Sequence, residues 1–151
     1  MREILFRGKI LEEDDVSQNG NWVYGYLVYA KSDFDDETQR VADIIPHDTD
    51  RVYKGEYNVV FPCDIKTMGQ YTGLTDKNGK KIFEGDVIWG DDCTGTWHKG
   101  VVEYDDSICS FIINAKRFMQ YPKNENHYDL LGCWSIEGNV HDNPELLESK
   151  Q

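Results

Sequence analysis

Residues 85–104 read GDVIWGDDCTGTWHKGVVEY and divide into a short apolar run, a polar loop and a longer alternating run. Gly85 and Asp86 stand directly before the first run, and Gly95 lies in the loop. Short alternating runs bounded by glycine are typical of β-strands. A Gly-Asp pair, a strand, a loop and a bent hairpin follow one another in this order in SH3-like barrels. The stretch therefore predicts an SH3-like barrel that begins at residue 86.

The sequence on either side contains more short strands and no long helix. Turn residues such as Asn19-Gly20 and Asp105-Asp106-Ser107 separate the runs, as expected for hairpins. Asn143 can cap a short C-terminal helix with Pro144 at its first position, where the missing N–H costs nothing. The strands that the pattern predicts are residues 2–9, 22–30, 41–45, 51–53, 56–61, 86–89, 96–104, 108–114, 128–133 and 135–140.

This pattern predicts a mainly β protein with two small β subdomains. The first covers residues 1–65, and Pro62 is expected to end its last strand. Residues 66–85 are expected to connect the two, with an Asn-Gly turn at Asp76–Gly79. The second covers residues 86–151, as an SH3-like barrel with the short C-terminal helix. A chain of 151 residues can bury such cores without disulfides or metals.

The chain is strongly acidic, with a formal net charge of -12. Residues 31–50 and residues 81–110 each contain seven acidic and two basic side chains, while only residues 51–80 have a small basic excess. Nucleic-acid-binding proteins usually present a basic face to the phosphates. Nucleic acid is therefore a less expected partner than a basic protein.

The ends and the cysteines indicate a cytoplasmic protein. The N-terminal residues MREILFRG are charged at once, so we expect no signal peptide. No run approaches the roughly 20 apolar residues that span a membrane. The four cysteines are spread singly, which favours free thiols in a reducing compartment; they are Cys63, Cys93, Cys109 and Cys133.

No cofactor or metal site is predicted. Cys93 with His98, and His127 with Cys133, have separations that a metal ion tolerates. Zinc sites are recognised by tighter pairs such as CxxC, and neither pair has a second close partner.

No catalytic residues are predicted either. Glu84 and Asp86 share one side of a strand, but no apolar pocket near them in sequence would raise one pKa, so backbone capping is the favoured interpretation. Residues 75–80 lack the spacing of a phosphate-binding loop, which favours an exposed hairpin tip. We therefore predict a protein that is not an enzyme; an enzyme with a site dispersed over the fold stays open.

Aromatic and acidic side chains are the candidate interaction residues. Trp22, Tyr24 and Tyr26 alternate along one strand, and a packed core is the favoured interpretation of this stripe, with a binding surface as the alternative. Gly25 between the tyrosines indicates a bulge or a close backbone approach. Tyr71 is expected to anchor the connector, with Gly73 supplying a positive φ, although its ring is also a candidate contact. The acidic candidates are Asp35, Asp36, Asp91 and Asp92.

Several segments resemble the YopX family of phage and prophage proteins. They are REILFR at residues 2–7, WVYGY at 22–26, QYTGL at 70–74, DKNG at 76–79, IFEGDV at 82–87 and GNVHDNPELL at 138–147. The resemblance implies a mostly β protein with a C-terminal SH3-like part and an origin in a bacteriophage or an integrated element. It implies no reaction and no catalytic residues.

These observations together predict a non-enzymatic interaction or accessory factor. Its partner would be a host or phage protein, and a homo-oligomer is also expected. The alternative is a nucleic-acid-binding accessory protein that uses the SH3-like part and the lysines of the basic stretch, Lys66, Lys77, Lys80 and Lys81.

Overall fold

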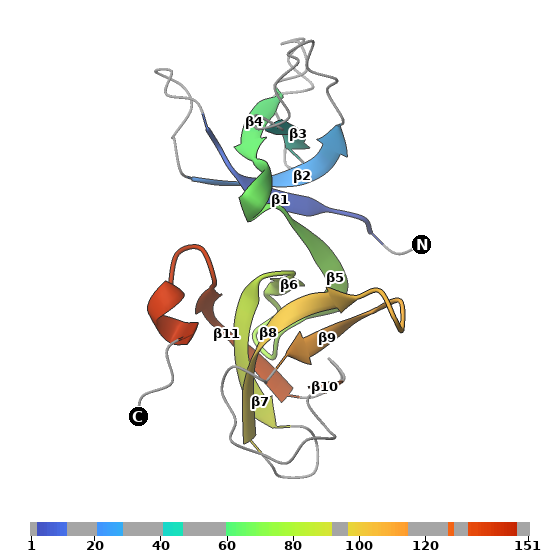
Figure 1. Cartoon of the computed structure of the whole chain (residues 1–151), viewed down its shortest axis with the longest axis vertical. Helices are drawn as coiled ribbons and strands as arrows, with labels where there is room; N and C mark the ends of the chain where they lie inside the picture. The colour runs from blue at the N-terminus through green and yellow to red at the C-terminus, as the bar shows by residue number, and fades with distance from the viewer. Residues whose placement is uncertain are drawn as a thin grey trace. The chain divides into compact units, whose positions relative to one another are not determined.

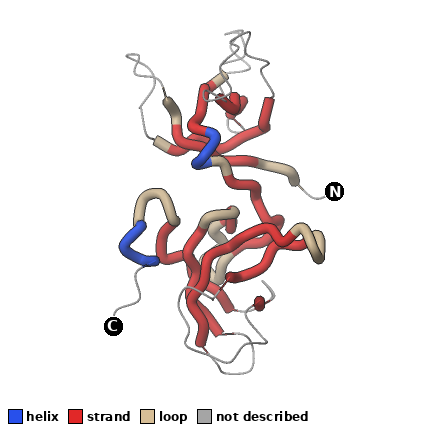
Figure 2. Tube along the Cα trace, in the orientation of Figure 1, coloured by secondary structure: helices blue, strands red, loops and turns tan. Residues whose placement is uncertain are grey.

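The structure is a computed structural model that describes residues 3–11, 21–28, 41–46, 60–91, 97–114, 127–128 and 133–147. The chain forms two compact units, residues 1–70 and residues 71–151 (Figure 1). Both units consist of antiparallel strands, and the described residues contain helix only as two 3-10 turns (Figure 2). The prediction of a mainly β protein is confirmed.

The first unit is a curled antiparallel sheet. The end of β1 bridges to β4, where Ile10 pairs with Cys63 and the N–H of Leu11 donates to Pro62 O at 2.9 Å. The elements are β1 (Phe6–Lys9), β2 (Trp22–Val28), β3 (Val41–Pro46), β4 (Phe61–Asp64) and the turn η2 (Ile65–Thr67), and the first residues of β5 (Gly69–Thr75) pair with β1. Pro62, which the sequence predicts to end the last strand of this unit, instead lies inside β4. It stands opposite Asp43 of β3, and its carbonyl accepts from Leu11 N.

One face of this sheet holds the core of the first unit. Val23 and Ile44 are buried there with Ile10 and Cys63, and Phe6, Phe61 and Met68 pack against them. Gly25 lies on the same face of β2, opposite both Phe6 and Pro46, with no shift of register. A Cβ at Gly25 would stand 1.9 Å from Ile45 O. Of the two predicted explanations for this glycine, the close backbone approach is correct.

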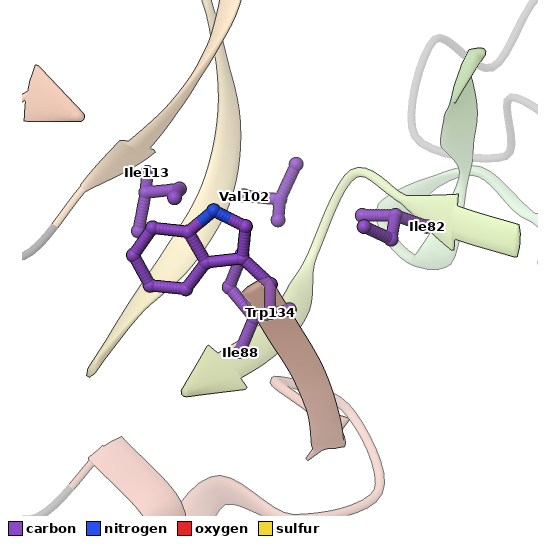
Figure 3. Close-up of a cluster of buried hydrophobic side chains, with 5 residues drawn as sticks. All are labelled: Ile82, Ile88, Val102, Ile113 and Trp134. Atoms are coloured by element: carbon purple, nitrogen blue, oxygen red, sulfur yellow. The ribbon is translucent and has the colours of Figure 1, made fainter. Parts of the chain in front are cut away.

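The second unit contains a five-stranded sheet in the order β10-β9-β8-β7-β11. Its strands are β7 (Asp86–Asp91), β8 (Trp97–Asp105), β9 (Ser110–Asn114), β10 (His127–Tyr128) and β11 (Cys133–Asn139), while β6 (Lys81–Phe83) pairs with the later residues of β5. The core gathers around Trp134, with Ile88, Val102 and Ile113 beside its indole and Ile82 completing the cluster (Figure 3).

The predicted SH3-like barrel is not confirmed, because the described residues form no closed barrel. Among the described pairings, β10 and β11 are the two ends of the sheet and do not join. The turn at residues 76–80 covers part of the outer edge of β11: Lys77 N donates to Trp134 O at 2.9 Å, and Ile136 N donates to Asp76 Oδ2 at 3.4 Å. Covered edges prevent pairing with other chains.

The expected C-terminal helix is a single 3-10 turn, η3 (Pro144–Leu147). Asn143 stands at the cap position that the sequence predicts, directly before Pro144, and its carbonyl accepts from Leu146 N at 3.0 Å. Its Oδ1 accepts from the N–H of Asn139 at 3.4 Å, behind the turn, and its Nδ2 donates to Glu145 at 3.3 Å. The side chain of Asn143 thus contacts the loop that precedes the turn, while its carbonyl accepts the first hydrogen bond of the turn.

Asp76 organises the 76–80 turn. Its Oδ1 accepts from the backbone N–H groups of Asn78 at 2.8 Å and Lys80 at 2.9 Å, while Oδ2 accepts from Asn78 Nδ2 and Ile136 N. Burial alone would raise the pKa of Asp76, but the donors of Lys80, Asn78 and Ile136 favour the ionised carboxylate and lower its pKa below the ordinary value. The segment that faintly resembles a phosphate loop is thus a turn built on one carboxylate.

We expect Asp76→Asn to destabilise the second unit by about 2 kcal/mol at neutral pH, because an amide nitrogen would face the N–H of Ile136. Since the folded pKa of Asp76 is lowered, the stability it contributes is present above the unfolded pKa of about 3.9 and is lost as pH falls through the folded pKa. Urea denaturation at pH 7 and at low pH should show the difference between wild type and variant shrinking on acidification. Asp64→Asn is the matched control, because among the described residues the Asp64 carboxylate accepts one backbone N–H, from Lys66. A difference that stays constant with pH would contradict this assignment.

Candidate interaction surface

The aromatic stripe of β2 lies on the outer face of the first sheet. Its residues alternate with Val23 and Gly25, which face the core. Tyr24 is 44% exposed and Tyr26 is 50% exposed. The interpretation of this stripe as packed core, which the sequence favours, is therefore wrong for the two tyrosines.

Charged side chains flank the stripe. Arg7 and Lys9 of β1 stand opposite Tyr24 and Trp22 in the register, so they share its face. Arg7 Cζ lies 4.7 Å and Lys9 Nζ 5.6 Å from the centre of the Trp22 ring, within cation–π range. On β3, Ile45 stands opposite Tyr26 and Asp43 stands opposite Val28, so both extend the same face. Arg7 is only 5% exposed, so it does not line the exposed surface itself. We call the exposed surface the aromatic face: Lys9, Trp22, Tyr24, Tyr26, Val28, Asp43 and Ile45.

Tyr71 is not on an exposed surface. It is 7% exposed, and its ring packs against Phe83 with centroids 5.5 Å apart, while Lys81 Nζ lies 5.3 Å from its centre. Gly73 has a φ of 89°, in a stretch where the β5–β6 register is irregular. The positive φ predicted for Gly73 is confirmed, and the burial of Tyr71 agrees with an anchoring role.

The acidic candidates are less fully placed. Asp91 ends β7 and stands opposite Trp97. Asp35, Asp36 and Asp92 lie outside the described residues. Their role in binding stays a prediction.

A second exposed aromatic pair was not singled out from the sequence. Trp89 of β7 and Trp97 of β8 are 39% and 54% exposed, and their rings stack with centroids 5.6 Å apart at 29°. The alternation of β7 places Trp89 on one face with Val87. In the β7–β8 register Trp89 stands opposite Lys99, and Trp97 stands opposite Asp91. The two tryptophans are therefore diagonal neighbours, which only the register reveals.

Glu84 and Asp86, the carboxylate pair considered for catalysis, lie at the turn between β6 and β7. Asp86 is 2% exposed, and its Oδ2 accepts from Phe83 N at 2.8 Å. Gly85 between the two strands has a φ of 82°, and its N–H donates to Val102 O. These contacts support the capping role predicted for this segment.

Cys63 and Cys109 are free thiols, as the sequence predicts for these two residues. Burial, with a smaller contribution from the nearby charge of Asp43, raises the pKa of Cys63 to about 12. Its thiol donates to Phe61 O at 3.3 Å. Because the thiolate is the nucleophilic form, Cys63 is an inert core residue at neutral pH.

Metal ligands do not gather in the part of the chain that the structure describes: no three His, Cys, Asp or Glu side chains there converge as around an ion. His98 is buried, and Cys93 lies outside the described residues. Within the same residues, no helix has the length and apolar character needed to cross a membrane.

Comparison with known proteins places the chain in a family. A search of curated proteins finds no match. One similar solved structure is the crystal structure of protein EF1440 from Enterococcus faecalis, with 20% identity and a TM-score of 0.49 over 98% of this chain and 100% of that chain. The model of the YopX protein family matches residues 14–148, which is most of the sequence. The chain belongs to the YopX family.

Proposed function

We propose that the protein is a non-enzymatic accessory factor that binds another protein through the aromatic face. The observation that carries this proposal is the exposure of Tyr24 and Tyr26 on a strand whose opposite face is packed into a core. Hydrogen-bonded neighbours on both sides hold β2 in place, so the two rings cannot turn inward. Exposed tyrosines on a rigid sheet supply contact area at low entropic cost, and tyrosine is enriched at interfaces.

The partner we propose is a basic protein surface. The chain carries a net charge of -12, and each of the two units contains 14 acidic and 8 basic side chains. Complementary charge accelerates the encounter with a basic partner and disfavours other acidic proteins. Consistent with the family resemblance, we propose an origin in a phage or prophage, action in the bacterial cytoplasm and a host or phage protein as the partner. The acidic segments 31–50 and 81–110 would contribute to this attraction.

A tagged full-length chain, used to capture partners from nuclease-treated lysate of its bacterium, tests the proposal. We expect a stoichiometric basic protein, with capture falling at least about tenfold in the double variant Tyr24→Ser and Tyr26→Ser, since interface tyrosines each contribute on the order of 1 kcal/mol or more. Tyr104→Ser is the matched control, because Tyr104 is also 44% exposed but belongs to the second unit. Circular dichroism should show that all variants keep the wild-type fold.

If the double variant and the Tyr104→Ser control captured equal amounts of partner, the aromatic face would not be the binding surface. If the capture recovered only further copies of the chain itself, the aromatic face would be assigned to a homo-oligomer interface instead. If turnover of a small molecule were found, the chain would be an enzyme with a dispersed site.

The second candidate is binding of nucleic acid through the second unit, its sheet then acting as an SH3-like part. The observation that favours it is the exposure of Lys77 and Lys80 on the 76–80 turn, and of Lys66 in the first unit. Captured material that disappears after nuclease treatment, with a steep dependence on salt, would favour this candidate.

A further inference from the structure

The Trp89–Trp97 stack is a second exposed aromatic surface, separate from the aromatic face. The two indoles come from neighbouring strands of the second unit and lie diagonally across the β7–β8 register. Each keeps more than a third of its surface open to solvent although the rings already stack on one another. The pair therefore leaves part of both indoles exposed on a hydrogen-bonded sheet.

The basic side chain beside this stack is already neutralised. Lys99 stands opposite Trp89 on β8, and its ammonium lies 2.9 Å from Glu137 Oε2 on β11. Glu137 is the extra residue of a bulge, because the β11–β7 register passes from Ile136 directly to Gly138. Bulges re-aim side chains, and this one directs a carboxylate across β7 to the only lysine of β7, β8 and β9.

The second unit has an acidic excess, with 14 acidic and 8 basic side chains. Residues 81–110, which include both tryptophans, contain seven acidic side chains and only Lys81 and Lys99 as basic ones. A single-stranded nucleic acid could stack its bases on the indoles, but such sites combine stacking with a positively charged groove. This stretch has the opposite charge.

We propose that the Trp89–Trp97 stack receives an arginine side chain from a basic protein segment. A guanidinium is planar and weakly hydrated, so it stacks on an indole better than an ammonium does. The first unit already contains this contact, with Arg7 Cζ at 4.7 Å from the centre of the Trp22 ring. The acidic excess of the second unit adds long-range attraction to the same cation. This inference does not depend on the aromatic face, because it concerns different residues in the other unit.

The test uses the full-length chain and two labelled probes, hexa-arginine and hexa-lysine peptides, measured by fluorescence anisotropy at low and physiological salt. If charge alone determined binding, the two peptides would have equal affinity. We expect hexa-arginine to bind about fivefold more tightly, since a cation–π contact is worth about 1 kcal/mol. Trp97→Ala should remove that preference by weakening hexa-arginine binding much more than hexa-lysine binding. Trp97→Phe should restore part of the preference.

Tyr104→Ala is the control, because Tyr104 is an exposed aromatic residue of β8 outside the stack. Equal affinity for the two peptides in the wild type, or an equal preference in Trp97→Ala, would overturn the inference. Tight binding of an oligothymidine that is lost in Trp97→Ala would also overturn it and assign the stack to single-stranded nucleic acid. The peptide test is independent of the capture experiment, because Tyr24→Ser and Tyr26→Ser change the first unit and leave the Trp89–Trp97 stack intact.

Discussion

Gly25→Ala is expected to destabilise the first unit by at least about 3 kcal/mol, the upper range for overpacking a closely packed site. The added Cβ would stand 1.9 Å from Ile45 O, 2.7 Å from Ile45 C and 2.9 Å from Pro46 Cα. All three are backbone atoms of β3, so no side chain can turn away to make room. The β2 and β3 strands must separate, and their hydrogen bonds must lengthen or break.

The matched control for this variant is Gly79→Ala. Gly79 has a φ of 81° and nothing within 4 Å of an added Cβ, so alanine there is expected to cost only about 1 kcal/mol from the left-handed backbone. Urea denaturation followed by circular dichroism compares the two, and amide NMR spectra show which unit loses its dispersed signals. In Gly25→Ala, signals from β1 to β4 should disappear first. A Gly25→Ala midpoint equal to that of Gly79→Ala would show that β3 does not approach β2 as closely as described.

Local patterns were sufficient to predict most of the strands. Period-two alternation marks β2 at residues 22–28, and an Asp-rich turn joins β8 to β9. In that turn Asp105 Oδ1 accepts from the N–H of Ser107 at 2.8 Å, which is the local hydrogen bond that favours aspartate in turns. Likewise Asn139 Oδ1 accepts from the N–H groups of His141 and Asp142 at the end of β11. Such contacts span two to four residues and are visible in sequence.

Which face of a strand is buried could not be read from alternation. The pattern of β2 shows only that Trp22, Tyr24 and Tyr26 share one side, and their larger apolar area favours that side as the core. The structure buries the other side, with Val23 and the close approach at Gly25. Burial depends on which other segments cover a face, and this information lies far away in the sequence.

Long-range register accounts for the features that local patterns do not predict. The Trp89–Trp97 stack and the Lys99–Glu137 ion pair both require the pairing of three strands and a bulge at Glu137. Closure of a barrel depends in the same way on whether distant edge strands meet, and the described ends β10 and β11 do not. Spacing within one segment contains no signal for any of these features.

Trp134→Ala is expected to destabilise the second unit by about 4 kcal/mol, within the range for truncating a large core aromatic residue. Trp134 is 1% exposed, and its ring contacts side chains from β7, β8 and β9, so its loss opens a cavity that four strands share. Trp134→Phe should cost much less, about 1–2 kcal/mol for the lost volume. The indole Nε1 has no hydrogen-bond partner among the described residues, so phenylalanine leaves no described acceptor unpaired.

Trp97→Ala serves as the control for this series, since Trp97 is 54% exposed on the same sheet and truncation there is expected to change stability by about 0.5 kcal/mol or less. Because each variant removes a fluorophore, unfolding in urea should be followed by circular dichroism rather than by tryptophan emission. The expected order of midpoints is wild type, Trp97→Ala, Trp134→Phe and then Trp134→Ala. If Trp134→Ala cost no more than Trp97→Ala, the cluster around Trp134 would not be the core of the second unit. The register that places Trp89 beside Trp97 would then lose its support as well, because β7 and β8 present Ile88 and Val102 to that core from their opposite face.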